Sequence, residues 1–377
     1  MLTNFGIGTL VLIAAISGRA LAASARRGGY VPLVADFFGD EDTRALAERH
    51  VRLDTSIARG MVADELFAAL ETLASAQRPA GTVCGTGFED RPELLARVSE
   101  RWGLLGNSAE TVARVKDPLA FAALCSECEI PHPQTSLRPP ADPRSWLAKR
   151  RGGAGGTHIT FVSDSKHNGG VDYFQRRVDG TPVSALLLAD GRRGMVLGFS
   201  AQWSAPSPPH RFRYGGAVRP AVLTPKLAEA VTGAVERLIA AVPLVGLNSV
   251  DFLIDGDTFW LLEINPRPGA TLDIFEPADH SLFALHVDAI RGSLPERVPV
   301  LSGAAASATV YAPNDIASMP AIDWPEWAAD RQNAGTSVSA GEPVCTVLAQ
   351  ANEPAAAKAL AEQRVTAMLA KLVPRQP

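Results

Sequence analysis

Cysteine is scarce in this chain, which has four cysteines among 377 residues. Four scattered thiols are too few for a disulfide framework. Cys125 and Cys128 form the one close pair, in a segment with a helical pattern and without a second pair of ligands nearby. We therefore predict buried structural thiols at these positions rather than a zinc or redox site.

Long apolar runs and an excess of positive charge are also missing. No run reaches the roughly 18 apolar residues that a membrane helix needs. Thr9–Ile16 has no positive segment before it and is only about as long as a strand, which favours a buried strand over a signal peptide. A net charge of −4 provides no basic footprint for nucleic acid. These absences predict a cytoplasmic protein without membrane or nucleic-acid partners.

Two common nucleotide-binding fingerprints are absent as well. Ser17-Gly18-Arg19 is followed by Ala-Leu and not by the glycine spacing of a dinucleotide-binding turn. The glycine-rich stretch Gly152–Thr157 is not followed by Gly-Lys-Ser/Thr, so it is not a Walker loop. A hydrophobic content of 46% and a charged content of 20% fit a globular chain, whose length allows two or three domains.

The first 110 residues alternate short apolar runs with helical segments. This rhythm predicts a parallel sheet, which binds ligands beyond the carboxyl ends of its strands. The loops Ser17–Arg19, Asp36–Gly39 and Gly85–Asp90 are therefore candidates for contacting a small substrate. The predicted strands are Thr9–Ser17, Tyr30–Asp36 and Thr82–Thr86, and the predicted helices are Ala20–Arg27, Glu41–Arg49 and Ala58–Gln77.

The middle and end of the chain have a more antiparallel pattern. Trp146–Phe161 reads as a strand ending in Lys149, a glycine-rich loop and a second strand. Glycines let a backbone approach a polyphosphate and direct N–H groups toward it. Ser108 is the expected N-cap of a helix in the connector Trp102–Pro133. Further strands are predicted at Asp172–Val178, Pro182–Ala189, Met195–Ala201 and Gly215–Ala221, and helices at Pro225–Val242 and Pro354–Leu372.

The most informative stretch is Gly246–Glu276. The apolar runs Asn248–Ile254 and Thr258–Ile264 flank an Asp-Gly-Asp turn, which is a strong β-hairpin signal. Glu263 and Asn265 are two residues apart on the second strand, so both lie on one face. The sequence thus places two polar side chains together at the end of an apolar strand.

The same hairpin predicts a metal site. Asp251 on the first strand can meet Glu263 and Asn265 across the pair, and two carboxylates with an amide oxygen suit Mg²⁺ that is shared with phosphates. Arg267 follows between two prolines that stiffen its backbone. Its fork-shaped cation suits a phosphate or a carboxylate.

The order of these features resembles the ATP-grasp superfamily over about residues 1–300. The resemblance is carried by Lys116, Lys149 with its glycine-rich loop, Gln175–Val178, and the hairpin with Asp251, Glu263 and Asn265. It implies a Rossmann-like domain, two α+β lobes that clasp ATP, and a small C-terminal β-rich domain similar to that of the carboxylase-type branch. The expected fold class is therefore α/β plus α+β, with domains at 1–112, 113–180, 181–300 and 301–377.

The resemblance also implies roles for individual residues. Lys116 and Lys149 would contact phosphates, and Arg267 would clamp a phosphate as a catalytic residue. This chain has Gln175-Arg176-Arg177 where many relatives carry an acidic residue at the hinge. The implied lid residues are Gly152, Gly153, Gly155, Gly156 and Thr157. The implied adenine contacts are Gln175, Arg176, Arg177 and Val178. The implied Mg²⁺ ligands, with Mn²⁺ as the alternative ion, are Asp251, Glu263 and Asn265.

The implied activity is that of an ATP-dependent carboxylate–amine ligase, which transfers the γ-phosphoryl group to a carboxylate so that an amine can attack the acyl phosphate. The expected partners are a small-molecule carboxylate, an amine and a second copy of the chain. Arg213, the second candidate catalytic residue, lies with Arg211 and Arg219 in and after the proline-rich loop Pro206–Arg213. These arginines are candidates for docking the carboxylate, and a solvated basic loop is the alternative.

Three readings of the function stay open. The motif NPRPGATLDIFE is similar to ATP-grasp proteins encoded with one-carbon cofactor pathways of methylotrophic bacteria, which implies tetrahydromethanopterin or methanofuran-type cofactor biosynthesis. The C-terminal tail instead suggests a carboxylase-like enzyme that phosphorylates bicarbonate, although no biotin-attachment lysine motif accompanies it. The third reading is a nucleotide-binding module without catalysis.

Overall fold

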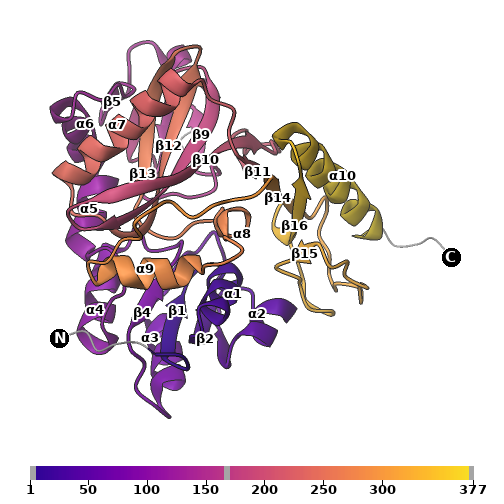
Figure 1. The fold of residues 1–377 in the computed structure, drawn as a ribbon. Coiled ribbons are helices and arrows are strands. Elements are labelled where there is room, and N and C mark those ends of the chain that lie inside the picture. Colours follow the sequence, from indigo (N-terminus) through magenta and orange to yellow (C-terminus); the bar gives the residue numbers. More distant parts are fainter. Residues whose placement is uncertain (1–5, 165–169, 373–377) are drawn as a thin grey trace.

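The computed structural model describes residues 6–164 and 170–372, and within these ranges the chain forms three β-sheets with helices packed on them (Figure 1). The first sheet is parallel and four-stranded, in the order β3-β2-β1-β4. Its elements are β1 (Leu10–Ala14), α1 (Arg19–Arg27), β2 (Val31–Asp36), α2 (Glu41–Leu46), β3 (Arg49–Arg52), α3 (Ala63–Ala74), β4 (Thr82–Cys84) and α4 (Pro92–Trp102).

This parallel sheet confirms the predicted rhythm but corrects some of its elements. The predicted helix Glu41–Arg49 ends at Leu46, and Arg49–Arg52 forms the edge strand β3. A charged edge strand discourages pairing with other chains, and its polarity hides it from a search for apolar runs. The predicted helix Ala58–Gln77 begins only at Ala63, and α4, which has proline at its first position, was not predicted.

The connector to the second sheet contains two helices rather than one, α5 (Ala109–Lys116) and α6 (Pro118–Glu127). Ser108 caps α5 as predicted. Asp117 ends α5 and caps α6, where Pro118 occupies the first position. The second sheet has the order β5-β8-β6-β7, formed by β5 (Thr135–Ser136), β6 (Trp146–Lys149), β7 (Ile159–Phe161) and β8 (Tyr173–Arg176).

Cys125 and Cys128 lie at the end of α6, where both thiols are free and buried. Burial raises the pKa of Cys125 to about 12, which keeps the thiol protonated and unreactive. The predicted burial of both cysteines is confirmed.

The third sheet is antiparallel and eight-stranded, in the order β13-β12-β9-β10-β11-β14-β16-β15. Because β11 pairs with β14, the strands after residue 301 extend the sheet of residues 181–300 instead of forming a sheet of their own. Its strands are β9 (Thr181–Asp190), β10 (Gly194–Ser204), β11 (Tyr214–Arg219), β12 (Val245–Asp255), β13 (Thr258–Asn265), β14 (Ala304–Tyr311), β15 (Ala328–Ala329) and β16 (Pro343–Ala351), with the helices α7 (Pro225–Ala241), α8 (Leu272–Phe275), α9 (Leu282–Ile290) and α10 (Pro354–Leu372).

Helices cover both faces of this large sheet. α7 packs on one face, and α8 and α9 pack on the other, where they also meet the first domain through α1. α10 covers β14 and β16 at the far end of the sheet (Figure 1). No helix among the described residues is both long and apolar enough to cross a membrane.

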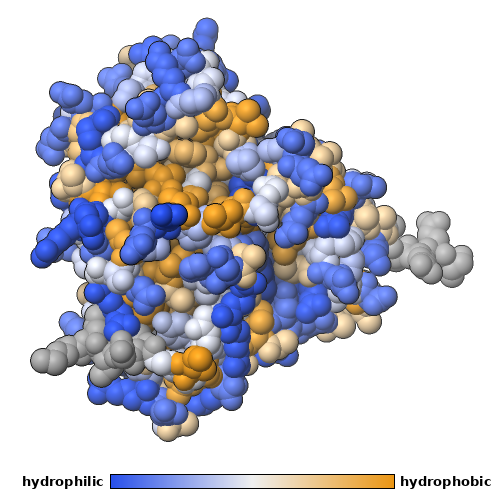
Figure 2. Space-filling view, viewed as in Figure 1, coloured by the Kyte–Doolittle hydropathy of each residue, from blue (hydrophilic) through white to orange (hydrophobic). Residues whose placement is uncertain are grey.

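The surface has a hydrophobic zone on the face shown in Figure 2. The outer parts of this face are largely hydrophilic, and hydrophobic residues gather toward its middle. The segment between α9 and β14 crosses the middle of this face (Figure 1) and exposes 81% of Val300.

Phe252 on β12 anchors the core beneath α7. It is 1% exposed and meets Phe259 edge to face, with ring centroids 5.7 Å apart. We expect Phe252→Ala to lower the free energy of unfolding by about 3–5 kcal/mol, because the truncation leaves a cavity. Urea unfolding measures the change. Leu119→Ala is the control, since Leu119 is 47% exposed and its loss should cost much less; equal losses in both variants would contradict the assigned core.

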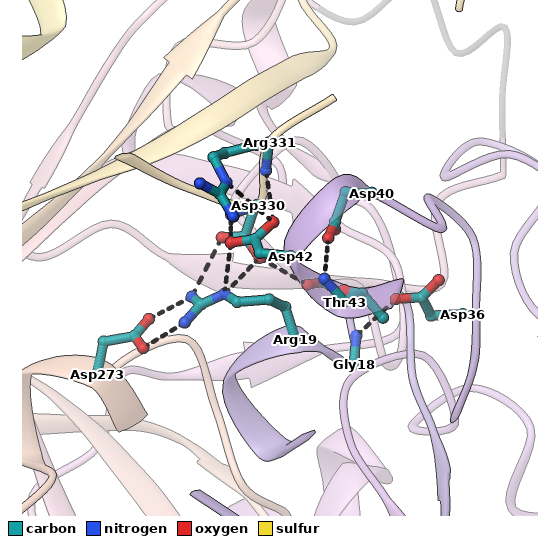
Figure 3. Close-up of polar contacts among 10 residues, drawn as sticks. Gly18, Arg19, Asp36, Asp40, Asp42, Thr43, Asp273, Asp330 and Arg331 are labelled. Atoms are coloured by element: carbon teal, nitrogen blue, oxygen red, sulfur yellow. Dashed lines mark hydrogen bonds and ion pairs between the residues drawn. The ribbon is translucent and has the colours of Figure 1, made fainter. Parts of the chain in front are cut away.

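Arg19 at the start of α1 connects the first domain to α8 and to the segment after β15 (Figure 3). Its guanidinium donates to both carboxylate oxygens of Asp273 on α8, at 2.6 and 2.5 Å. Its Nε donates to Asp330, which follows β15, at 3.1 Å. Asp42 on α2 lies 3.9 Å from the same nitrogen. Arg19 is 6% exposed, so these ion pairs hold the domains together away from solvent.

Asp40 beside this cluster is a buried N-cap. One of its oxygens accepts from the Thr43 N–H at 2.7 Å, and the other has no hydrogen-bond partner among the described residues. Burial, followed by the charges of Asp330 and Asp42, raises the pKa of Asp40 from 3.8 to about 9. The folded protein therefore keeps a proton that the unfolded chain releases above pH 3.8, and this group makes the fold less stable as the pH rises toward 9.

We therefore expect Asp40→Asn to stabilise the fold at alkaline pH. Asparagine is an equally good N-cap, and it does not ionise, so the variant should gain about 1–3 kcal/mol at pH 8.5 and less at pH 5. Urea unfolding at both pH values measures the difference. Glu41→Gln makes the same acid-to-amide change at the next residue, which is exposed, and should not raise the free energy of unfolding. If Asp40→Asn raises the free energy of unfolding equally at both pH values, Asp40 is not neutral in the folded protein.

Candidate functional site

The predicted hairpin forms, and it brings the proposed metal ligands together. Asp251 on β12 lies opposite Glu263 on β13, and Ser249 lies opposite Asn265. One carboxylate oxygen of Asp251 accepts from Asn265 Nδ2 at 2.9 Å, and the other accepts from Ser184 Oγ at 2.6 Å. Val250 and Ile264, their neighbours along the strands, pack in the core beneath α7, so the two carboxylates and the amide lie on the opposite face, which packs against α9 and the first domain.

Two lysines approach this hairpin from other elements. Lys116, the last residue of α5, donates from Nζ to Glu263 and to Asn265 Oδ1, both at 3.0 Å. Lys149, at the end of β6, donates from Nζ to Gln175 Oε1 at 2.7 Å. Both lysines are buried, at 8% and 7% exposure, so they are not the solvated surface groups that isolated lysines usually are.

The charges of these groups are strongly coupled. Partial burial disfavours the ionised form of Glu263, but Lys116 and then Lys149 outweigh this effect and lower the pKa of Glu263 to about 2. Burial, followed by repulsion from Glu263, raises the pKa of Asp251 to about 6. Burial also lowers the pKa of Lys149. The repulsion between the two carboxylates raises the pKa of Asp251. A cation bound between them would reduce this repulsion.

The glycine-rich loop borders a small cavity beside Lys116. Lys116, Gln175, Glu263 and the loop residues Gly152 and Gly153 line this cavity, whose volume is about 30 Å³. A Cβ atom at Gly152 would lie 2.4 Å from the backbone nitrogen of Asp90, and one at Gly156 would lie 1.9 Å from the carbonyl oxygen of Phe212. Gly155 and Gly156 also have positive φ angles, which only glycine adopts without strain. The loop therefore fits against its neighbours because Gly152 and Gly156 have no side chain at these two close approaches.

His158 follows this loop and was not predicted from the sequence. It lines the same cavity, and its Nδ1 is buried without a hydrogen-bond partner among the described residues. Burial is the main cause that lowers the pKa of His158 to about 4, so the imidazole is neutral. A lone histidine after a glycine-rich loop carries no sequence signal of its own.

Arg267 is held by a residue of the first domain. Its Nε donates to Glu89 Oε1 at 2.7 Å, and the other oxygen of Glu89 accepts from the backbone N–H groups of Gly87 and Phe88. Glu89 is 4% exposed, and the charge of Arg267 is the main effect that lowers its pKa against the cost of burial. The sequence named the loop Gly85–Asp90 as a ligand-binding candidate but did not single out Glu89.

The arginines of the proline-rich loop lie elsewhere. Arg213 donates to the carbonyl oxygens of Ala205 and Gly341, and its guanidinium lies 3.8 Å from the centre of the Tyr311 ring. It is 9% exposed and connects β11 to the C-terminal segment, so its contacts lend no support to a catalytic role. Arg211 lies 5.5 Å from the centre of the Phe161 ring, and Arg219 contacts α8 and the start of β14.

The predicted adenine contacts are only partly directed at the cavity. Gln175 is buried and lines it. The backbone N–H groups of Arg176 and Arg177 already donate to Gln134 and Ser145, and the Arg177 side chain pairs with exposed Asp179. Val178 lies two residues beyond the end of β8. The phosphate side of the predicted site is therefore assembled more completely than the adenine side.

The donor set fits a hard cation that shares its coordination with a ligand. Among the described residues, no group of three or more His, Cys, Asp or Glu side chains could hold a metal ion. Two carboxylates and the Asn265 amide remain, and Mg²⁺ in phosphate-binding sites commonly uses one or two carboxylates with substrate oxygens. The residues present therefore suit Mg²⁺ bound together with a polyphosphate.

Comparisons with known proteins agree with this arrangement. Residues 117–271 match the family model of the ATP-grasp domain. The carbamoyl phosphate synthase large chain of Rubrobacter xylanophilus is 26% identical over 226 residues, 54% of this chain and 21% of that protein. The corresponding protein of Deinococcus radiodurans is 24% identical over 250 residues, 60% of this chain and 24% of that protein. The chain thus spans about a quarter or less of the length of these relatives.

Solved structures share the fold over nearly the whole chain. The biotin carboxylase domain of Hydrogenobacter thermophilus 2-oxoglutarate carboxylase, solved as a dimer with MgADP, ADP and bicarbonate, has a TM-score of 0.73 and 13% identity and covers 94% of this chain and 88% of that one. Campylobacter jejuni biotin carboxylase has a TM-score of 0.72 and 14% identity, over 93% and 89% of the two chains. At these identities the likeness concerns the fold alone. The family-model match confirms the predicted resemblance to the ATP-grasp superfamily over residues 117–271.

Proposed function

Since residues 117–271 form an ATP-grasp domain, we propose that this chain is an ATP-dependent ligase that activates a small carboxylate and joins it to an amine. The observation that carries the proposal is one polar cluster, in which Lys116 binds Glu263 and Asn265, Asn265 binds Asp251, and Lys149 lies close enough for the charges of Glu263 and Asp251 to influence it. Lys116 and Glu263 also line a cavity together with Gly152 and Gly153 of the glycine-rich loop. Separate segments supply these groups, and a protein without a polyphosphate ligand has little use for such a set.

Each residue has a part in holding the reactants. Asp251, Glu263 and Asn265 would hold Mg²⁺, which neutralises charge on the phosphoryl oxygens during transfer. Lys116 and Lys149 would bind the phosphates directly, with ammonium groups that are already desolvated and therefore interact strongly with an anion. Gln175 and the backbone near Val178 would face the base. No protein nucleophile is required, because positioning and charge stabilisation supply most of the catalysis in phosphoryl transfer.

Nucleotide entry requires the glycine-rich loop to move. The cavity of about 30 Å³ is far smaller than the roughly 300 Å³ or more of typical ligand sites. Gly152, Gly153, Gly155, Gly156 and Thr157 would swing away from Glu89, Asp90 and Phe212 and then close over the phosphates. We propose that the structure represents the closed position of this lid.

Glu89 would act as a positioning residue for Arg267. It binds Nε of the guanidinium and leaves the two terminal nitrogens for a phosphate or an acyl phosphate, apart from a long contact of 3.4 Å to the Pro268 carbonyl. A guanidinium fixed at one edge loses little conformational entropy on binding an anion. The first domain would in this way help to form the catalytic site.

The reaction would proceed through an acyl phosphate. The γ-phosphoryl group moves from ATP to a carboxylate oxygen, ADP leaves, and an amine then attacks the carbonyl carbon and displaces phosphate. The motif between Asn265 and Glu276 supports a place in one-carbon cofactor biosynthesis of the tetrahydromethanopterin or methanofuran type. We also propose a homodimer and the domain boundaries 112/113, 180/181 and 300/301.

A second candidate is phosphorylation of bicarbonate. It is favoured by one observation, the similarity to biotin carboxylase domains, which extends through the C-terminal strands to 94% of this chain. In that case bicarbonate would be the phosphoryl acceptor, and an amine or another nitrogen nucleophile would consume the product.

Release of ADP and phosphate from Mg-ATP tests the proposal. The chain is incubated with single and paired members of a panel of carboxylates and amines, including glutamate, tyramine-like amines and pterin carboxylates, and with bicarbonate alone. Release that needs both an acid and an amine supports the ligase. Bicarbonate-stimulated release without an organic acid supports the second candidate, and ATP binding without release under every condition contradicts both.

A further inference from the structure

A large groove lies where α1, α8 and the strands β14 and β16 meet, and the proposed function does not use it. Its volume is about 740 Å³, and α1, the segment from α8 to Ala278, the residues leading into β14, and the end of β16 form its walls. None of the residues that line the ATP-grasp cavity borders it. A groove of this size falls within the range of small-molecule sites.

Arg219 at the end of β11 is the unusual residue of this groove. It is 7% exposed, and its guanidinium donates to three carbonyl oxygens, those of Ile274, Ser302 and Gly303. No carboxylate among the described residues lies within ion-pair distance of it. Carbonyl groups satisfy hydrogen bonds but do not neutralise a positive charge, so a buried cation is left without an anion.

The other charges on the groove walls are already paired. Asp273 is bound through both carboxylate oxygens by Arg19. Glu276 accepts from Ser24 and lies 3.1 Å from Arg27. Arg219 is therefore the charge of the groove that lacks a counter-ion, and burial lowers its pKa accordingly.

The rest of the lining suits a ligand with an apolar body. Ala20, Ala23, Leu272, Leu301 and Leu348 provide apolar surface, and Gln350 and Asn352 provide neutral polar groups. We propose that this groove binds a small amphipathic carboxylate, whose anionic end contacts Arg219 and whose hydrocarbon part lies against the apolar wall. The site would be separate from the nucleotide cavity and would not depend on ATP.

Titration calorimetry with hexanoate and with its neutral amide, hexanamide, tests this site in the full chain without nucleotide. Hexanoate should bind wild type at least about tenfold more tightly than hexanamide, because only the acid forms a charge-assisted bond with Arg219. Inorganic phosphate has the charge without the apolar body and should bind more weakly than hexanoate.

Three variants locate the binding. Arg219→Gln should weaken hexanoate binding about tenfold and leave hexanamide binding unchanged, whereas Arg219→Lys should retain most of the affinity. Arg193→Gln removes the same charge from an exposed turn and should change nothing. Ala23→Leu fills the groove from the surface of α1, keeps a good helix former, and should weaken both ligands.

Circular dichroism and light scattering accompany each titration. If Arg219→Gln does not fold, the proposal is tested by the hexanoate affinity of Ala23→Leu and by the preference of wild type for hexanoate over hexanamide. Equal affinity of acid and amide for wild type, or unchanged hexanoate binding in Ala23→Leu, would overturn the proposal. A third result would also overturn it: wild type is a dimer that does not bind hexanoate, and Ala23→Leu is a monomer. A second copy of the chain would then occupy the groove.

Discussion

Replacing Glu263 with glutamine should lower ATP turnover by about two to three orders of magnitude. The substitution keeps the size of the side chain but removes a charge that the two lysines stabilise strongly enough to lower the pKa of Glu263 to about 2. It would also remove a Mg²⁺ ligand, and the remaining donors, Asp251 and Asn265, would hold the ion less firmly. ADP release at saturating Mg-ATP, with the substrates found in the panel, measures the effect.

Asp255→Asn is the matched control for this experiment. It makes the same carboxylate-to-amide change in the same hairpin, but Asp255 is exposed at the turn, away from Lys116. Turnover should be unchanged in the control, and the unfolding midpoint of Glu263→Gln should show that the variant is folded. A Glu263→Gln enzyme with more than about a tenth of wild-type turnover would contradict a metal-binding role.

Replacing Lys149 with methionine should weaken ATP binding by about a hundredfold. The Lys149 ammonium is buried, donates to Gln175, and lies near Glu263 and Asp251, whose charges influence its pKa. A desolvated cation contributes more to anion binding than a solvated one, and a charged hydrogen bond to phosphate contributes about 1.5–3 kcal/mol. Methionine has nearly the same length and is apolar, so the packing of β6 should be preserved.

Equilibrium binding of Mg-ATP to wild type and Lys149→Met measures this loss without the need for a known acceptor substrate. Lys226→Met on α7 removes an exposed ammonium and is the control. The control should bind ATP as wild type does. Equal affinities for Lys149→Met and wild type would place the phosphates elsewhere, whereas a loss confined to turnover would mean that Lys149 acts only in the transition state.

These two tests separate the binding of nucleotide from the chemistry. The Lys149 variant addresses the phosphate contacts, and the Glu263 variant addresses the metal. A chain that binds Mg-ATP and loses affinity with Lys149→Met, yet releases no ADP with any acid, amine or bicarbonate, would be a nucleotide-binding module.

The local parts of the site were predictable because a few neighbouring residues determine them. The Asp-Gly turn and the two-residue period of Glu263 and Asn265 encode the hairpin within about twenty residues, and the structure has Asp251 opposite Glu263. Ser108 as an N-cap and the strand that ends at Lys149 depend on equally short stretches. The polar edge strand β3 was missed because its pairing with β2, and not its own pattern, makes it a strand.

The long-range parts of the site required the tertiary structure. Lys116 reaches Glu263 across 147 positions of the chain, and Glu89 reaches Arg267 across 178. In the sequence these residues look like ordinary solvated charges, and so does Arg213, whose guanidinium turns out to bind backbone carbonyls. Thus the sequence by itself determined the hairpin, the strands and the types of donor atoms, since neighbouring residues encode them. Only the fold decided which charges are buried and paired, because burial and pairing depend on segments that are far apart in the chain and close in space.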